Sequence, residues 1–78
     1  MPDFTPEQIA EARENPRPGD VWAFNDYQIF VGDVSMTEIL GSVLHIEGRV
    51  INIDPCVSFM PSRFAARCAT ATLLRRGA

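Results

Sequence analysis

The chain changes character at PRPGDVW, residues 16–22. Two prolines and a glycine make this stretch typical of a rigid turn. Because proline disfavours helical geometry in the residue before it, a helix arriving from the N-terminal side has to end by Asn15. From Val21 onward, apolar and β-branched residues come in short runs, which favours strands. The stretch therefore predicts a short helix before it and a β-rich region after it.

The residues before this turn carry the signals of a helix start. Thr5 can act as the N-cap, and Gln8, three residues later, completes a capping box. Phe4 and Ile9 have the spacing of a hydrophobic staple. These signals predict a helix over residues 6–14. A helix this short is not stable alone in water, so we expect it to pack on the rest of the chain.

Behind the turn, five apolar runs are separated by glycine, asparagine, aspartate and proline. The runs expected to form strands are 21–24, 27–34, 39–46, 49–53 and 69–74. Gly48 tolerates a positive φ, so residues 46–49 are typical of a tight hairpin. Five short strands with tight connections indicate a small antiparallel barrel or a strongly bent sheet. The predicted class is α+β, mainly β, with the short helix at the N-terminus.

Alternation along the strands predicts which side chains face inward. In the second run, Tyr27 shares a face with Ile29 and Val31. In the third run, we expect Leu44 and Ile46 to face inward, and their neighbours Val43 and His45 to face outward. Residues 61–64 interrupt the strands and are expected to form one helical turn, with Phe64 closing the open end of a barrel. We expect the chain to fray after Leu74.

Length and composition set the class of protein. The chain has 78 residues, of which 46% are hydrophobic, and a net charge of −3, which indicates one folded domain over 1–78. Within it we expect a helical arm and turn over 1–17, a small barrel over 18–74 and a tail over 75–78. No apolar run is long enough for a membrane helix, and the N-terminus has no signal-peptide pattern, so we expect a cytoplasmic protein.

The charges are unevenly placed. Residues 1–39 hold eight acidic side chains against two arginines, whereas residues 40–78 hold two acidic side chains against five arginines. This distribution predicts an electrostatic dipole if the fold keeps the halves apart. The acidic total argues against general coating of DNA, which depends on many basic side chains.

Four residues are candidates for metal binding or nucleophilic chemistry: His45, Asp54, Cys56 and Cys68. Structural zinc sites usually take their ligands in close pairs, a spacing that these residues lack. A thiol nucleophile would need His45 as its base and a carboxylate such as Asp54, but a chain this short leaves little room for a substrate pocket. We therefore expect free thiols buried as small apolar side chains, no metal, no cofactor and no enzyme activity.

The aromatic residues leave two interpretations open. Trp22 and Phe24 share a face of the first run, and both belong either to the core or to an exposed patch for a protein partner. In the second interpretation, Trp22 is the apolar anchor and carboxylates surround it. The predicted partner-binding residues are Asp20, Trp22, Phe24, Asp26, Tyr27, Asp33 and Glu38.

The PGDVW stretch at 18–22, the five runs and the helical turn before the last run resemble SH3-like small barrels. PGDVW and the SRF motif at 62–64 also resemble short proteins encoded by bacteriophages and prophages. The resemblance covers about residues 16–74 and implies no catalytic residue. It implies a non-enzymatic protein that inhibits a host complex, such as an anti-CRISPR protein that blocks a nucleic-acid-handling effector. Its acidic first half would occupy a basic channel of that complex.

Two alternatives stay open. A small barrel of this kind could bind nucleic acid through its arginine-rich second half, with Arg63, Arg67, Arg75 and Arg76 as contacts. It could also be an assembly component of a virion. In the favoured reading the partner is a host protein or complex, direct binding to nucleic acid is not expected, and the chain is a monomer or a weak homodimer.

Overall fold

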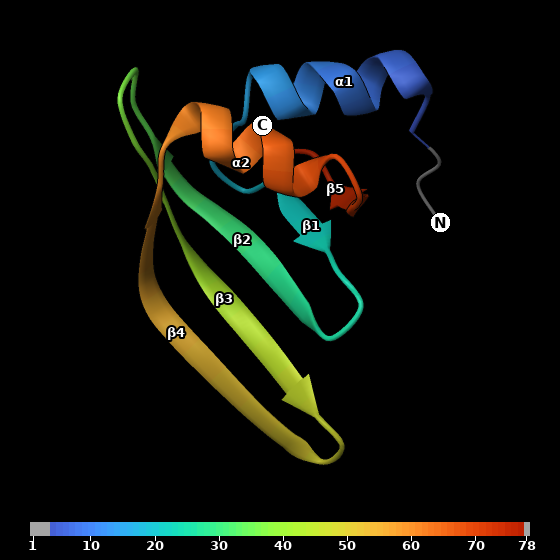
Figure 1. Ribbon diagram of the computed structural model, residues 1–78, viewed down its shortest axis with the longest axis vertical. Coiled ribbons are helices and arrows are strands. Elements are labelled where there is room, and N and C mark those ends of the chain that lie inside the picture. Colours follow the sequence, from blue (N-terminus) through green and yellow to red (C-terminus); the bar gives the residue numbers. More distant parts are fainter. Residues whose placement is uncertain (1–3, 78) are drawn as a thin grey trace.

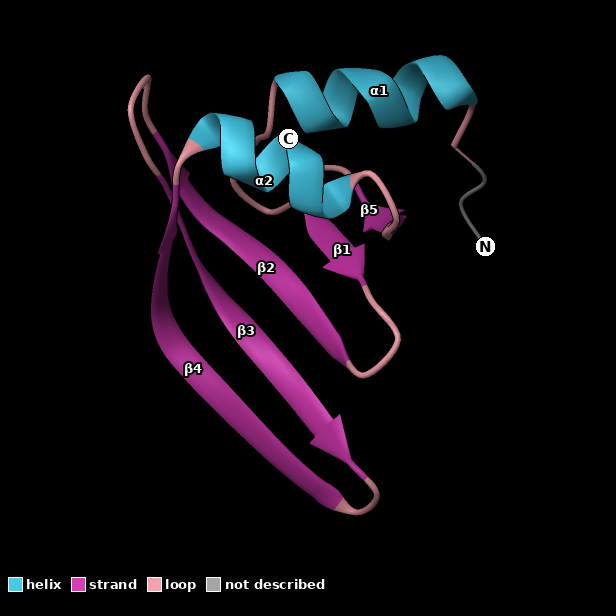
Figure 2. Cartoon of the chain, in the orientation of Figure 1, coloured by secondary structure: helices cyan, strands magenta, loops and turns pink. Residues whose placement is uncertain are grey.

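The computed structural model describes residues 4–77 and consists of two helices and five strands (Figures 1 and 2). In chain order these are α1 (Pro6–Glu14), β1 (Val21–Ala23), β2 (Tyr27–Val34), β3 (Ile39–Glu47), β4 (Val50–Phe59), α2 (Pro61–Cys68) and β5 (Thr72–Arg75). The predicted class, mainly β with a short N-terminal helix, is confirmed.

The strands form one antiparallel sheet in the order β4-β3-β2-β1-β5. The register shifts between Val31 and Asp33 in β2, and between Gly41 and Val43 in β3. Such bulges bend a strand and increase its twist. The five-stranded sheet is thus present in its bent, open form, with β4 and β5 as its two edges.

Three elements differ from the prediction by more than one residue at a boundary. Residues 55–59, expected as a break, continue β4, and Pro55 is tolerated there because β4 is an edge strand. Helix α2 has eight residues instead of one turn, because Phe64 and Cys68 lie one turn apart and bury a common face. The last strand begins at Thr72 and reaches Arg75.

Helix α1 begins as its sequence predicts. The backbone N–H of Gln8 donates to Thr5 Oγ1 (3.2 Å), and the N–H of Thr5 donates to Gln8 Oε1 (2.8 Å), so the capping box is complete. Ala12 is buried, and Ile9 packs against the core. Figure 1 shows α1 lying beside α2, and Arg13 donates to the carbonyl of Ala69 just after α2. The short helix is thus stabilised by tertiary contacts.

The two faces of the sheet have different surroundings. Residues directly opposite in an antiparallel ladder point to the same side, so Trp22, Ile29 and Val43 share a face. All three are buried beneath the helices, and we call this side the inner face. The expectation for β3 was therefore wrong, since Val43 faces inward while Ile46 faces outward and is exposed. Because β3 has apolar residues at both odd and even positions, alternation does not show which side chains face inward. The pairing of β3 with β2 determines this.

The core lies between the inner face and the helices. Its buried apolar residues are Ala12, Trp22, Ile29, Val31, Ile39, Val43, Phe64, Cys68 and Leu73. Phe64 meets Trp22 edge to face, with ring centroids 6.5 Å apart, so it fills the middle of the core instead of closing one end. Of the two interpretations of Trp22, the core interpretation is correct.

Candidate functional site

A groove of about 560 Å³ runs between the inner face of the sheet and α2. We call it the inner groove. Its lining residues are Tyr27, Val43, His45, Asp54, Val57, Ser58, Phe59, Arg63 and Arg67. They come from β2, β3, β4 and α2, so the groove exists only in the folded chain.

The position of α2 directs two arginines into this groove. Phe64 and Cys68 are fully buried and fix the rotation of the helix about its axis. Arg63 and Arg67 precede these two residues by one position each, so they share the neighbouring face of the helix. Both arginines are exposed and line the groove.

Aromatic rings form the walls around Arg67. Tyr27 stacks on Phe24, with ring centroids 4.4 Å apart and an interplanar angle of 7°. The guanidinium of Arg67 donates to the Tyr27 hydroxyl (3.4 Å) and lies 5.5 Å from the centre of the Phe59 ring. Arg67 thus bridges two aromatic walls and is held at the groove by hydrogen bonding and cation–π attraction.

An imidazole–carboxylate pair stands at the β3–β4 side of the groove. His45 Nε2 lies 3.2 Å from Asp54 Oδ2, and the two rings of His45 and Tyr27 are 5.8 Å apart. Both members of the pair are well exposed to solvent. The groove therefore offers two guanidinium groups, aromatic surface and one paired carboxylate.

The cysteines do not join this pair. Cys56 is exposed and lines a shallow hollow with Phe30 and Leu40, whereas His45 lies in the inner groove. Cys68 is in the core, where burial raises the pKa of its thiol to about 12. Both thiols are free, but only Cys68 is buried as expected. Within residues 4–77, no three histidine, cysteine or acidic side chains gather as metal ligands.

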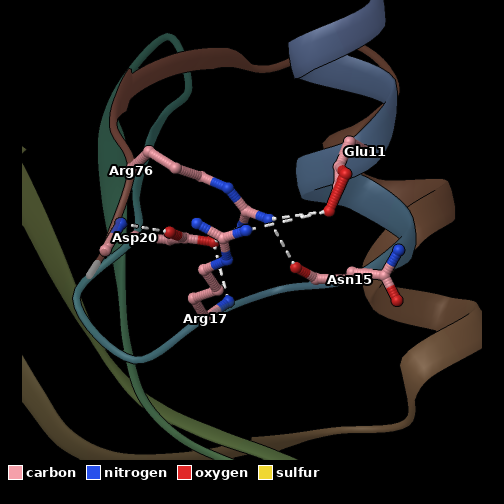
Figure 3. Close-up of polar contacts among 6 residues, drawn as sticks. Glu11, Asn15, Arg17, Asp20 and Arg76 are labelled. Carbon is pink, nitrogen blue, oxygen red and sulfur yellow. Dashed lines mark hydrogen bonds and ion pairs between the residues drawn. The ribbon is translucent and has the colours of Figure 1, made fainter.

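Asp20 is one of the predicted partner-binding residues, but its side chain is not accessible to a partner. Its side chain is fully buried and accepts hydrogen bonds from the backbone N–H of Arg17 (2.9 Å), the backbone N–H of Gly77 (2.6 Å) and the guanidinium of Arg76 (Figure 3). Gly19, with φ of 97°, lets the chain turn back between Arg17 and Asp20. The PGD part of PGDVW thus builds an internal anion site for the C-terminal segment.

The C-terminal segment is held by the same cluster. Arg76 donates to the carbonyl of Asn15 (2.7 Å) and lies 3.6 Å from Glu11, which Figure 3 shows on the neighbouring helix. A Cβ on Gly77 would overlap the carbonyl oxygen of Pro18. The expected fraying after Leu74 is therefore wrong for residues 75–77, which belong to the fold. Position 78 of the expected tail lies outside the described residues.

The other predicted partner-binding residues do not form one patch. Trp22 is buried in the core and offers no surface to a partner. Asp26 lies in the turn between β1 and β2, while Asp33 and Glu38 lie near the β2–β3 turn, at the opposite end of β2. That strand spans roughly 26 Å, so the carboxylates are too far apart to surround a single anchor. Only Tyr27, backed by Phe24, reaches the inner groove.

A scan against protein-family models and searches of curated proteins and of solved structures find no match to this chain. Neither helix in the described part of the chain is long and apolar enough to cross a membrane. Sequence reasoning did not place Arg63 and Arg67 with Tyr27 and Phe59. The sequence pattern that could have predicted this is the spacing of the arginines. They lie one helical turn apart, and each directly precedes a residue that is buried in the core.

Proposed function

We propose that this chain is a non-enzymatic binding domain that holds an extended, acidic segment of a partner protein in the inner groove. The observation that supports this most directly is the position of Arg63 and Arg67 across the groove from an edge strand. The partner is still expected to be a protein. The binding surface is now the inner groove with its two arginines, instead of an acidic patch around Trp22.

The edge position of β4 favours an extended ligand. Edge strands carry backbone N–H and C=O groups that are not used within the sheet, and a peptide can add to them as a further strand. Val57, Ser58 and Phe59 belong to β4 and also line the groove. A peptide added at this edge would run beside these three residues, at the rim of the groove.

The arginines favour an acidic ligand. A guanidinium matches the geometry of a carboxylate, with which it can form two parallel hydrogen bonds. Because both arginines are exposed, each such pair contributes only about 0–1 kcal/mol. The aromatic surface of Tyr27 and Phe59 therefore has to supply an apolar contact between the charged ones.

Nucleic acid fits the same groove less well. Binding to phosphates draws its free energy from many cations acting together, and this chain has a net charge of −3. Arg76, expected among the nucleic-acid contacts, is engaged by Asp20 and Glu11 instead. Of the four expected contacts, only Arg63 and Arg67 line the groove, and two arginines suit a short acidic peptide better than a polyanion.

We further propose that the partner is a host complex and that the chain acts as an anti-CRISPR protein. This part of the proposal rests on the resemblance to phage proteins. The two motifs on which the resemblance rests, PGDVW and SRF, each contain a residue that stabilises the fold. Asp20 of PGDVW binds the C-terminal segment, and Phe64 of SRF fills the core. Recognition of such a partner would therefore depend on residues outside these motifs, with Arg63 as the exception within SRF.

The test measures fluorescence anisotropy with three labelled probes. These are a peptide of alternating glutamate and valine, a matched peptide of alternating lysine and valine, and oligothymidine. We expect binding of the glutamate peptide only. The variant R63Q/R67Q should bind it about tenfold more weakly, which corresponds to two exposed ion pairs. R75Q is the matched control, because Arg75 lies on β5, away from the groove.

Three outcomes would overturn the proposal. One is preferential binding of oligothymidine that R63Q/R67Q abolishes, which would favour the nucleic-acid alternative. Another is equal binding of both peptides. The third is an equal loss of affinity in R75Q and in R63Q/R67Q. Circular dichroism of each variant confirms that the fold is retained.

A further inference from the structure

The outer face of the sheet is apolar although both helices lie against the inner face. Ile46, Ile51 and Ile53 keep 43%, 62% and 63% of their surface exposed. They are neighbours, since Ile46 pairs with Ile51, and Leu44 pairs with Ile53, across the β3–β4 ladder. Phe30 is exposed on the same face one strand away. A contiguous group of exposed apolar side chains of this kind marks a contact surface.

Charges of opposite sign stand at the two ends of this face. Asp33 pairs with Leu40 near the start of β3, and Glu38 lies in the adjoining turn. Arg49 lies in the β3–β4 turn, beyond the other end of β3. Both ends are exposed and are separated by the length of β3, roughly 30 Å for its nine residues. The face is therefore acidic at one end and basic at the other, with apolar side chains between them that lie nearer the basic end.

We propose that two copies of this chain pack outer face against outer face, about a two-fold axis that runs across the strands. Such an axis reverses the strand direction in the second copy. Arg49 of each copy then lies opposite the end of the other copy's face that carries Asp33 and Glu38, while Ile53 of each copy meets its counterpart near the axis. The same patch serves on both copies, as a two-fold interface requires. The charge pattern is complementary to itself only in this antiparallel orientation.

The dimensions of the molecule permit this packing. Figure 1, viewed down the shortest axis, shows β2, β3 and β4 lying broadly in the plane of view. A standard interface buries roughly 800 Å² per partner. The two longer extents of the molecule are 34 and 29 Å, so such an interface would occupy most of this side. Packed sheets lie about 10 Å apart. The inner grooves point away from the interface, so this proposal stands independently of the proposed function.

Light scattering after size-exclusion chromatography gives the first test. The wild-type chain should approach twice its 8.7 kDa mass as its concentration rises. I51S/I53S should remain a monomer, because it removes the two most exposed isoleucines from the face. M36S is the matched control: Met36 is 97% exposed but lies in the β2–β3 turn, off the apolar face, so M36S should dimerise like the wild type.

A charge swap tests the orientation. R49E should weaken the dimer about tenfold, and D33R/E38R should do the same, because each places like charges opposite one another. The triple variant R49E/D33R/E38R should recover wild-type affinity. Only the antiparallel arrangement predicts this recovery. If each substitution weakened the dimer by disturbing the fold, the losses of affinity would add up in the triple variant.

Cys56 serves as a native probe of the axis. It lines the same hollow as Phe30, Leu40 and Ser42, near the middle of the face, whereas Cys68 is buried. A short bis-maleimide should therefore link two wild-type chains, and C56S should abolish the link. Three results would overturn the proposal: a wild-type monomer at all concentrations, a dimer that I51S/I53S leaves intact, or a triple variant weaker than R49E.

Discussion

The β1–β5 side and the β3–β4 side of the sheet contain the same residue types, but these residues are buried on the first side and exposed on the second. Around β1 and β5, Asp20 and Arg76 bind each other beneath α1, and Leu73 is buried. Around the β3–β4 hairpin, Arg49 is exposed and Ile53 keeps 63% of its surface in contact with solvent. The first region closes the fold, and the second leaves an unburied face.

This difference separates stabilising residues from candidate binding residues. The side chain of Arg76 is 16% exposed and contacts three residues, Asp20, Glu11 and Asn15, so its role is structural. Arg63 and Arg67 have the same charge but lie at a groove. Charge along the sequence is therefore a weak guide to function in this chain, because burial and pairing decide what each charge does.

The contrast between the two cysteines gives the largest expected effect. In the monomer, an aromatic disulfide reagent should modify Cys56 at once and Cys68 at least about a thousandfold more slowly, because Cys68 reacts only when the domain opens. Its pKa of about 12 also keeps it protonated. Thiol titration at low protein concentration, with C56S as control, measures the ratio. Two fast thiols would contradict the assigned core.

Breaking the enclosed region should destabilise the whole domain. D20A leaves Arg76 and the backbone N–H groups of Arg17 and Gly77 without their acceptor, so we expect a loss of about 3–5 kcal/mol in the free energy of unfolding. D26A removes an exposed aspartate and should change it by less than about 0.5 kcal/mol. Urea denaturation measures both. Equal effects would refute the structural role of Asp20.

The N-terminal helix should contribute a smaller amount. T5A removes the side chain that accepts from Gln8 and should cost about 1 kcal/mol. T37A, in an exposed turn, is the matched control and should be close to neutral. The same denaturation experiment measures both, and a loss above about 2 kcal/mol would mean that Thr5 makes a further contact.

Substitutions on the outer face of the sheet should hardly change the stability of the monomer. I53S replaces a side chain that is mostly exposed, so the free energy of unfolding should change by less than about 0.5 kcal/mol at concentrations where the chain is monomeric. I29S, on the buried face, is the contrasting variant and should be strongly destabilised. Similar losses in the two variants would show that the face of β2 or of β4 is misassigned.

Short-range signals predicted much of the fold. The capping box of α1 involves Thr5 and Gln8, three residues apart, and the hairpin at Gly48 needs only its positive φ of 61°. Proline at position 16 ended the helix, and five strands followed. These features depend on neighbours in the sequence, whose conformational preferences act before any tertiary contact forms.

Other features could not be read in this way. β3 has apolar residues at both parities, so alternation alone gives no single inner face, and the pairing of Val43 with Ile29 decides it. The inner groove joins residues from β2, β3, β4 and α2. No spacing rule brings Tyr27 beside Arg67, because 40 residues separate them in the chain.

The sequence by itself determined the helix start, the turn at residues 16–20 and the succession of short strands, because caps, prolines and glycines act on the backbone next to them. Only the tertiary structure decided that Asp20 is buried against Arg76, 56 positions away, while Arg63 and Arg67 remain available at a groove. The physical reason is that a carboxylate or a guanidinium has the same chemistry anywhere along a chain. Its role depends on the water and the charges that the fold places around it.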